Sequence, residues 1–505
     1  MISKFTRFLS TLLAAILLIP ALASCGESRD DVPAQTTAAQ QTGADEAETT
    51  ERDILAPVKD IDLGGVTLNI DISVNETEWE SSAPYVMGPE EETGEAVSDL
   101  VFRRNRDVAE MLNCGVNWTT QDFYYEGVFP HVQKYVNAGD GTIDMFINDQ
   151  LGLLKAAMNG MLVNALDPSF ESYFDFDSPG WYNEYMDQLS LSKDKRYVLA
   201  GDYFIDVLRG SHALYFNRSL LAEYFGSENE IYELVLNHEW TLDKLYYYVD
   251  GVYTDLNGSS TVDMDDRFGI WTNSPVLLYY ASDAGLTRFD PAGKPYLDVN
   301  YDRGSLLVDK ILSLYSTDGN LFKLTRNPSF TTYDSIERFA SGGTLFTYWC
   351  KIANFENNLL RNFDDIGVAP YPLLDESQSG YKTIVHDISD VGAFPITVTA
   401  EKMTALSAYI QAMTLHAAEY LMPAYYETAL KIKYAQDDYS SQMLDILTDG
   451  INSPFEMAFN SNLGGIFTSG ISASVSSMTN VYVSTTESKL EAAQKMLDEL
   501  IASLS

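Results

Sequence analysis

The stretch VTLNIDIS, residues 66–73, and the stretch EAVSDLVFRRNRDVAEMLNCGVNW, residues 95–118, together decide the class of fold. In the first stretch every second residue is apolar, which is the period of a half-buried β-strand. In the second, apolar residues recur at helical spacing until Gly115 ends the helix, and a second strand begins at Val116. The order strand, helix, strand is the start of an α/β layered fold.

The same alternation continues along the chain. TIDMFIN, residues 142–148, is predicted to be a further strand, and QLGLLKAAMNGMLVNA, residues 150–165, the helix that follows it. Strands that alternate with helices favour a largely parallel sheet, because parallel neighbours need a crossover connection. We therefore expect an α/β protein.

The last third of the chain is more helical. Residues 400–422 and 425–436 carry apolar faces, and we expect Pro423 to separate two helices there. A final helix is expected over residues 487–504, with Ser484 and Glu487 forming its capping box.

The N-terminus has the layout of an export signal. Lys4 and Arg7 precede an apolar run over residues 9–22, and this run is shorter than the roughly 20 residues of a membrane-spanning helix. The segment Leu22-Ala23-Ser24-Cys25 resembles the lipobox of bacterial lipoproteins, in which the cysteine becomes the lipidated first residue of the mature chain. An ordinary secretory signal with a chance cysteine is the alternative. We predict a lipoprotein signal peptide over residues 1–24 and lipidation at Cys25.

A polar segment follows the predicted lipidation site. Residues 26–56 are rich in Thr, Ala, Gln, Asp and Glu and contain no aromatic residue. Such a segment cannot bury enough apolar surface to offset its ordering entropy, so residues 25–56 are predicted to be a lipidated cysteine followed by a disordered spacer. The body of the protein would then be anchored by lipid at the extracellular face of the cell membrane.

Composition limits the partners of the remaining chain, which is long enough for two or three domains. The formal net charge is −41, and loss of Lys4 and Arg7 with the signal would make it more negative still. A surface of that charge repels nucleic acid and anionic lipid headgroups. Cys114 and Cys350 are the only other cysteines. They are either bridged or, as we expect, two unpaired buried thiols.

The residue patterns of common enzymes are missing from the sequence. His131, His212, His238, His386 and His416 form no zinc-ligand spacing, and there is no nucleophile elbow, P-loop or dinucleotide fingerprint. With 73 acidic residues, a glycosidase carboxylate pair has no sequence signature here. The one polar cluster, His386-Asp387, is typical of a turn. We expect a protein that is not an enzyme.

Three long stretches carry a resemblance to a known family. They are HALYFNRSLLAEYF (212–225), HEWTLDKLYYYV (238–249) and DLNGSSTVDMDDRFGIWT (255–272). In this order they resemble the extracellular solute-binding proteins of ABC importers, in particular the carbohydrate-type group (family 1-like). Further segments are similar to segments of that family: residues 142–166, RFASGGTLFTYW (338–349), DIGVAPYPL (365–373) and, as in clostridial members, residues 425–447. Together they span most of residues 60–500.

The resemblance implies a two-lobed periplasmic-binding-protein-like fold of type II. Each lobe would be a mixed, mostly parallel sheet flanked by helices, and several chain crossings would form the hinge. The expected divisions are a first lobe over residues 57–208, a second lobe over 209–370, a return to the first lobe over 371–432, and helices of the second lobe over 433–505. The resemblance also implies a monomer that binds a small-molecule solute, works with the transmembrane subunits of a permease, and needs no cofactor.

A sugar site needs aromatic platforms beside polar side chains, because sugars present apolar faces ringed by hydroxyls. Asn148, Asp149 and Gln150 are candidates because they end a strand at the edge where α/β sheets bind ligands. Trp240 and Trp118 are expected in the core. The remaining candidates are Tyr348, Trp349, Trp271, Trp181, Trp79, Asp387, Asp202 and Tyr203.

One loop has the spacing of a calcium site. Asp255, Asn257, Ser259, Thr261, Asp263 and Asp266 occupy positions 1, 3, 5, 7, 9 and 12 of an EF-hand-type loop. Ser260 stands where such loops carry glycine, and position 12 is Asp rather than Glu. The loop either holds a structural Ca²⁺ or is a polar loop of Asx turns.

The functional expectation is a membrane-tethered extracellular receptor that captures a carbohydrate or oligosaccharide between two lobes for an ABC transporter. Two alternatives remain at this stage. One is a cell-surface hydrolase that acts on glycans, and the other is a sensory or adhesion lipoprotein without a transport role. Turnover of a glycan would indicate the first, and the absence of a neighbouring permease gene would indicate the second.

Overall fold

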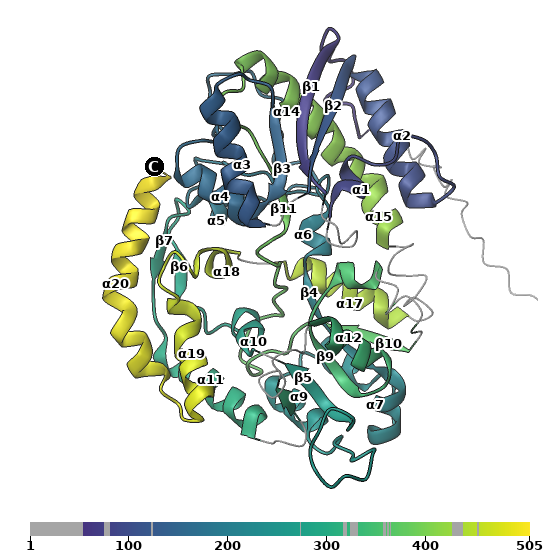
Figure 1. The fold of residues 1–505 in the computed structure, drawn as a ribbon, viewed down its shortest axis with the longest axis vertical. Coiled ribbons are helices and arrows are strands. Elements are labelled where there is room, and N and C mark those ends of the chain that lie inside the picture. Colours follow the sequence, from purple (N-terminus) through teal and green to yellow (C-terminus); the bar gives the residue numbers. More distant parts are fainter. Residues whose placement is uncertain are drawn as a thin grey trace, which may run out of the picture. The chain divides into compact units, whose positions relative to one another are not determined.

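The computed structural model describes residues 54–74, 81–122, 125–272, 274–316, 321–323, 332–356, 360, 363, 365–426, 438–451 and 454–504 (Figure 1). The predicted signal peptide, Cys25, almost all of the spacer and Trp79 lie outside these residues. So does most of the helix expected over residues 425–436.

The first sheet has four strands, β1 (Val66–Ser73), β2 (Cys114–Gln121), β3 (Met145–Asp149) and β11 (Asp390–Ala393). Their order is β11-β3-β1-β2, with β1 parallel to β2 and β3, and β11 antiparallel to β3. The helix α2 (Ala96–Met111) connects β1 to β2, α3 (Tyr125–Ala138) connects β2 to β3, and α4 (Gln150–Met158) follows β3 directly. We call this sheet and the helices packed on it the first lobe.

The second sheet has five strands, β4 (His212–Asn217), β5 (Phe268–Thr272), β8 (Leu321–Lys323), β9 (Thr344–Lys351) and β10 (Ile366–Ala369). Their order is β10-β4-β9-β5-β8. Here β5 is parallel to β8 and β9, whereas β4 is antiparallel to β9 and β10, so this sheet is evenly mixed rather than mostly parallel. We call this sheet and its helices the second lobe.

The remaining elements flank the sheets or connect them (Figure 1). They are α1 (Ala83–Val86), α5 (Asn183–Ser190), α6 (Asp206–Arg209), α7 (Arg218–Phe225), α8 (Glu230–Leu236), α9 (Leu242–Val249), α10 (Val276–Ala281), β6 (Thr287–Phe289), β7 (Pro295–Leu297), α11 (Tyr301–Ser316), α12 (Thr332–Ala340), η2 (Ile352–Glu356), α14 (Ala400–His416), the π-helical turn η3 (Ala417–Leu421), α15 (Met422–Tyr425), α17 (Asp438–Asp449), α18 (Phe455–Phe459), α19 (Ile466–Ser477) and α20 (Tyr482–Ser503).

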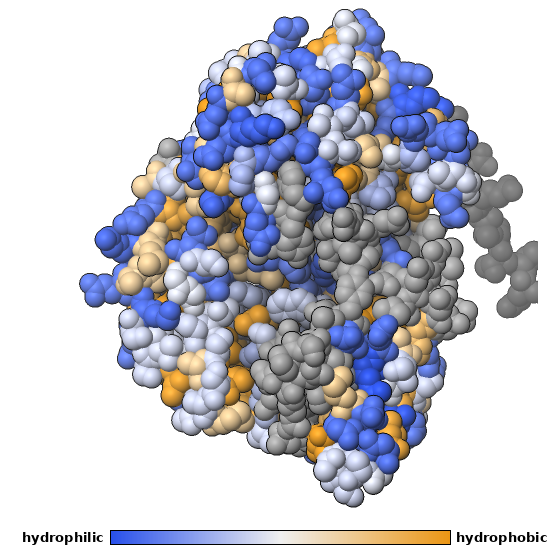
Figure 2. Space-filling model, in the orientation of Figure 1, coloured by the Kyte–Doolittle hydropathy of each residue, from blue (hydrophilic) through white to orange (hydrophobic). Residues whose placement is uncertain are grey.

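The cores form where apolar faces meet, which explains why the sequence pattern predicts the elements well. Leu68, Ile70 and Ile72 of β1 are fully buried, as the alternating pattern predicts. Each such side chain contributes about 1.5–3 kcal/mol when removed from water. The helix α14 packs against β1 and α2 and is buried along most of its length. On the face seen in Figure 2, hydrophilic residues dominate around β1, β2 and α2.

Two chain segments lie side by side where the chain passes between the lobes. The His212 N–H donates to the Ile384 carbonyl at 2.7 Å, and the His386 N–H donates to the Gly210 carbonyl at 2.8 Å. Ser211 and Val385 form an antiparallel bridge between these hydrogen bonds. The lobes are therefore joined by two hydrogen-bonded chain segments, residues 210–212 and 384–386, which we call the hinge.

Two local expectations are wrong. Pro423 does not separate two helices: η3 leads directly into α15, with Pro423 in its first turn, where a missing N–H is tolerated. The last helix begins at Tyr482, so Ser484 lies inside it and its hydroxyl donates to the Val481 carbonyl instead of capping. The interior Ser is satisfied by this local hydrogen bond.

Cys114 and Cys350 are free thiols, and only Cys350 is fully buried. Within the described ranges, no helix combines the length and the apolar character needed to cross a bilayer.

Candidate functional site

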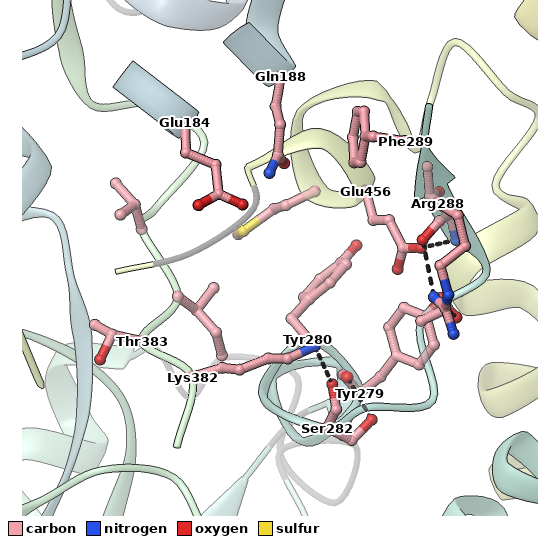
Figure 3. A pocket seen from close by; sticks show the side chains of 15 residues that line it. Glu184, Gln188, Tyr279, Tyr280, Ser282, Arg288, Phe289, Lys382, Thr383 and Glu456 are labelled. Carbon is pink, nitrogen blue, oxygen red and sulfur yellow. Dashed lines mark hydrogen bonds between the residues drawn. The ribbon is translucent and has the colours of Figure 1, made fainter. Parts of the chain in front are cut away.

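A cavity of about 230 Å³ lies between elements of the two lobes, and we call it the central pocket (Figure 3). The first lobe contributes Glu184 and Gln188 of α5. The helix α5 is tied to the first sheet because the adjoining chain pairs with β11 through Leu199 and Gly392. The second lobe contributes residues of α10, β6 and α18, and the hinge segment 382–385 lies at one side.

Two neighbouring cavities continue the central pocket. One, lined by α5 and the β6–β7 turn, shares Glu184, Gln188 and Phe289 with it. The other, which we call the α4 pocket, is lined by α4, α18 and Asp387, and shares Met457 with it. A solute in the central pocket could therefore extend in either direction along the boundary between the lobes.

Aromatic side chains supply the apolar walls of the central pocket. Tyr279 and Tyr280 extend from α10, and Phe289 from β6 (Figure 3). The Phe289 ring meets the Phe455 ring edge-on at 5.6 Å, which fixes α18 against the ribbon β6–β7. Such rings suit the apolar face of a sugar ring.

Glu456 is the acidic group of the second lobe in this pocket. Its Oε1 accepts the Thr287 N–H at 2.7 Å. Burial raises the pKa of the Glu456 carboxyl, while hydrogen bonding and the charge of Lys382 oppose that rise. Burial, together with the negative charge of Glu456, raises the pKa of Tyr279 well above its ordinary value, so this phenol stays protonated.

The two basic groups of the pocket are already engaged. Lys382 Nζ donates to the Ser282 carbonyl at 2.9 Å, and burial lowers the pKa of this ammonium. Arg288 Nη1 donates to the carbonyls of Gly285 and Thr287, and its Nε lies 3.9 Å from Asp298.

At least one buried polar atom of the pocket has no partner within the described chain. Gln188 is 6% exposed, yet its Oε1 accepts no hydrogen bond there, whereas the Tyr279 hydroxyl lies against the Glu456 carboxylate. A buried polar atom without a partner costs about 1–3 kcal/mol, and a solute that hydrogen-bonds to it recovers that cost.

The three candidates at the end of β3 form a buried cluster beside the α4 pocket rather than part of its wall. Asp149 Oδ1 caps α4 by accepting the Gly152 N–H, and Gln150 Oε1 accepts the Tyr185 hydroxyl at 2.7 Å. Burial raises the pKa of Asp149 well above its usual range, and the nearby charges of Asp390 and Asp387 add to the rise. Asn148 Nδ2, Asp149 Oδ2 and Gln150 Nε2 have no partner among the described residues.

Of the ten sites predicted within the described chain, Asp387 is the one that lines a described pocket. It borders the α4 pocket and lies 3.2 Å from His386 Nδ1. Tyr348 is buried, and its hydroxyl accepts the Leu278 N–H. Trp349 has a left-handed backbone, with φ of 65°, and its ring lies 5.4 Å from that of His212.

The other four predicted residues are distributed through the two cores. Trp181 Nε1 donates to Gln411 Oε1 at 3.1 Å, and Trp271 packs beside Phe268 in the second sheet. Asp202 accepts the Tyr182 hydroxyl at 2.8 Å. Tyr203 is fully buried beneath the Arg104 guanidinium. Their roles in solute binding stay predictions.

Sequence reasoning missed most of the central pocket. Tyr279 and Tyr280 lie in the second half of α10, the helix after β5, so the strand-end rule that selected Asn148 does not reach them. Glu456 and Lys382 carry no such signal, because they come from distant segments that only the folded chain brings together.

The predicted calcium loop is held by hydrogen bonds of its own. Asp255 accepts the N–H groups of Gly258, Ser259 and Ser260, and Asp263 accepts the Asn257 amide. Asp266 accepts the Tyr253 hydroxyl. Residues in the described ranges include no group of three or more His, Cys, Asp or Glu placed to hold a metal ion. Calcium binding here stays a prediction.

Comparison with known proteins gives matches in structure but not in sequence. No protein-family model matches the chain, and a search of the curated proteins finds no match. The GacH receptor of Streptomyces glaucescens, solved unliganded and with acarbose, matches with a TM-score of 0.49 at 13% identity over 86% of this chain and 99% of that chain. An ABC transporter solute-binding protein from Agrobacterium radiobacter in complex with ribitol matches with a TM-score of 0.48 at 11% identity over 86% and 100%.

The maltose/maltodextrin-binding domain MalE from Bdellovibrio bacteriovorus, bound to maltotriose, matches with a TM-score of 0.50 at 14% identity. The match covers 86% of this chain and all of that domain. An identity this low bears on the fold alone. With its two mixed sheets and paired crossings, the chain has the two-lobed α/β fold of periplasmic binding proteins, as expected from the sequence.

Proposed function

We propose that this protein is a membrane-tethered extracellular receptor that captures a carbohydrate between its lobes and delivers it to the permease of an ABC importer. The observation that carries the proposal is the central pocket, because the second lobe lines it with aromatic rings and the first lobe with a buried amide oxygen that has no partner among the described residues. A neutral hydroxyl group can donate to Gln188 Oε1, while sugar C–H faces pack on the rings. The structural relative from Bdellovibrio bacteriovorus binds maltotriose, which makes glycans the first solutes to test.

The mechanism follows from the position of the pocket. A solute that touches α5 on one side and α10, β6 and α18 on the other binds the closed form more tightly than the open form. Only such a difference in affinity shifts the equilibrium toward closure. The closed form would be the one that the permease recognises. Cys25 would keep the receptor beside the permease through its lipid.

Thermal melting of the full-length protein in mild detergent, scanned against mono- and oligosaccharides, tests solute capture. A ligand at 100 times its Kd adds about 2.7 kcal/mol to the free energy of unfolding, which moves the melting temperature by degrees. We expect a shift with a subset of glycans and no change in the glycan itself. Release of a product would instead support a hydrolase, and no shift with any glycan would contradict the carbohydrate assignment.

Membrane attachment is tested separately. Cys25→Ala should move the protein from the membrane fraction to the medium, whereas Cys114→Ala should leave it in the membrane fraction. Retention of the Cys25 variant on the membrane would contradict the lipid anchor.

A further inference from the structure

The geometry of the central pocket points to a more specific solute: we propose that it selects a carbohydrate bearing a protonated amino group, held among Glu184, Gln188 and Glu456. This inference rests on the proposed function, since it names the class of sugar that the same site takes.

The cationic side chains of the pocket are partly engaged within the chain. Lys382 points its ammonium at the Ser282 carbonyl, and Arg288 donates to two carbonyls of its own turn. An acidic sugar would have to share Lys382 with this carbonyl and with the charge of Glu456, and share Arg288 with Asp298.

The acceptors of the pocket are open, by contrast. Glu184 is an exposed residue whose carboxylate makes no hydrogen bond or ion pair among the described residues, and Gln188 Oε1 is buried and unpaired. Glu456 accepts the Thr287 N–H and also interacts with the Tyr279 and Thr287 hydroxyls, so it has less free capacity than the other two. An ammonium has three N–H donors, and these three side chains supply acceptors for them.

Formal charge leads to the same conclusion. Two carboxylates, Glu184 and Glu456, face the pocket, and Lys382 neutralises one of them. Arg288 is balanced by Asp298 outside the pocket wall. The pocket therefore has one uncompensated negative charge. The ammonium of an amino sugar would neutralise this charge, whereas the carboxylate of an acidic sugar would add a second one.

The two carboxylates come from opposite lobes, which couples the amino group to closure. Glu184 belongs to α5 of the first lobe, and Glu456 to α18 of the second (Figure 3). Closing the lobes brings like charges together, which is unfavourable unless a cation lies between them. An ammonium converts this repulsion into attraction, and the net charge of −41 raises the local concentration of cationic solutes.

Matched sugars test the inference by titration calorimetry on the full-length protein. The probes are glucosamine, glucose and glucuronate, with the galacto series in parallel, each as monosaccharides and as short β-1,4-linked oligomers. We expect the amino sugar to bind about tenfold more tightly than the neutral one, equivalent to about 1.4 kcal/mol, and the acidic sugar to bind more weakly than both. The advantage of the amino sugar should shrink as NaCl is raised.

Glu184→Gln should reduce the preference for the amino sugar over the neutral sugar to within about threefold, because the amide keeps an acceptor but not the charge. Glu491→Gln, on the exposed face of α20, is the matched control and should change nothing. Tightest binding of the acidic sugar, or an unchanged preference in Glu184→Gln, would overturn the inference while the receptor function stands. If none of these sugars and no glycan of the wider panel binds, the result would instead contradict the proposed function itself.

Discussion

The hinge and the central pocket both bury charged and polar side chains, but they differ in how those side chains are paired. At the hinge, Arg209 is 1% exposed and donates to Asp206, Glu356 and the Ser81 carbonyl at 2.7–3.0 Å. Tyr425 donates to Glu356 at 2.6 Å. In the pocket, Gln188 Oε1 is as well shielded from water and has no partner.

The difference distinguishes buried polar groups that stabilise the fold from buried polar groups that are available to a solute. A buried charged side chain whose hydrogen bonds are all made within the chain holds segments together, because removal of one partner leaves the other charges buried and unpaired. A buried polar atom without a partner is a cost that the folded chain bears until a solute arrives. The hinge cluster, formed by Arg209, Asp206, Glu356 and Tyr425, joins α6, η2, α15 and the segment just before α1, so it fixes the chain where the lobes join.

The largest effect should come from breaking the hinge cluster. Arg209→Met should lower the free energy of unfolding by about 3–5 kcal/mol, because Asp206 and Glu356 are left buried without their cation. Arg103→Met is the control: Arg103 pairs with Glu92 at 3.4 Å on the surface, where such a pair contributes less than about 1 kcal/mol. Denaturant unfolding of both variants checks this. If the two variants lose equal free energy of unfolding, the hinge cluster stabilises the fold no more than a surface ion pair does.

The pH dependence of stability is the next effect in size. Burial and the neighbouring charge of Asp206 raise the pKa of Asp390 to about 7, although Ser82 donates to its carboxylate at 2.5 Å. A carboxyl whose pKa is raised on folding stabilises the folded state at low pH, and this contribution is lost as pH rises from about 4 to about 7. Asp390→Asn should flatten the fall in melting temperature over this range. Asp445→Asn, exposed on α17, should not, and a slope unchanged in the Asp390 variant would contradict the assignment.

Two buried glutamines, one paired and one not, allow the same comparison between residues of one type. Gln378 is fully paired: its Nε2 donates to the carbonyls of Ala281 and Gly380, and its Oε1 accepts the Leu374 N–H. Gln378→Leu should cost about 2–3 kcal/mol of stability and leave glycan affinity unchanged.

Gln188→Leu should do the reverse, with stability unchanged or slightly higher and affinity for the best-binding glycan about tenfold lower. Chemical denaturation and calorimetry on both variants measure the two quantities side by side. A large loss of stability in Gln188→Leu would show that this amide serves the fold rather than the solute.

The smallest effect concerns the loop that carries the predicted calcium ligands. Because Asp255 and Asp263 are engaged within the loop, we expect melting in Ca²⁺ and in chelator to agree within about one degree. A stabilisation by Ca²⁺ that Asp263→Asn abolishes would show that the loop rearranges around the ion, as the spacing of its ligands predicts.

The fold followed from the sequence because its elements depend on local periodicity. The alternating residues of β1 and the amphipathic α2 each bury one face, and each pattern can be recognised without its neighbours. The errors arose where tertiary contacts decide: α20 extends to Tyr482 because that ring is buried against α11 and α19. Similarly, the chain stays helical through Pro423.

The site depended on contacts between segments far apart in the chain. The strand-end rule selects the cluster around Asp149, because strand ends are fixed by the local pattern. Gln188 and Glu456 are separated by more than half of the chain. The sequence by itself determined the class of fold and the order of its main elements, and it predicts an export-type N-terminus. Only the tertiary structure decided which polar atoms find partners and which are left for a solute, because hydrogen-bond pairing depends on distances that no local pattern encodes.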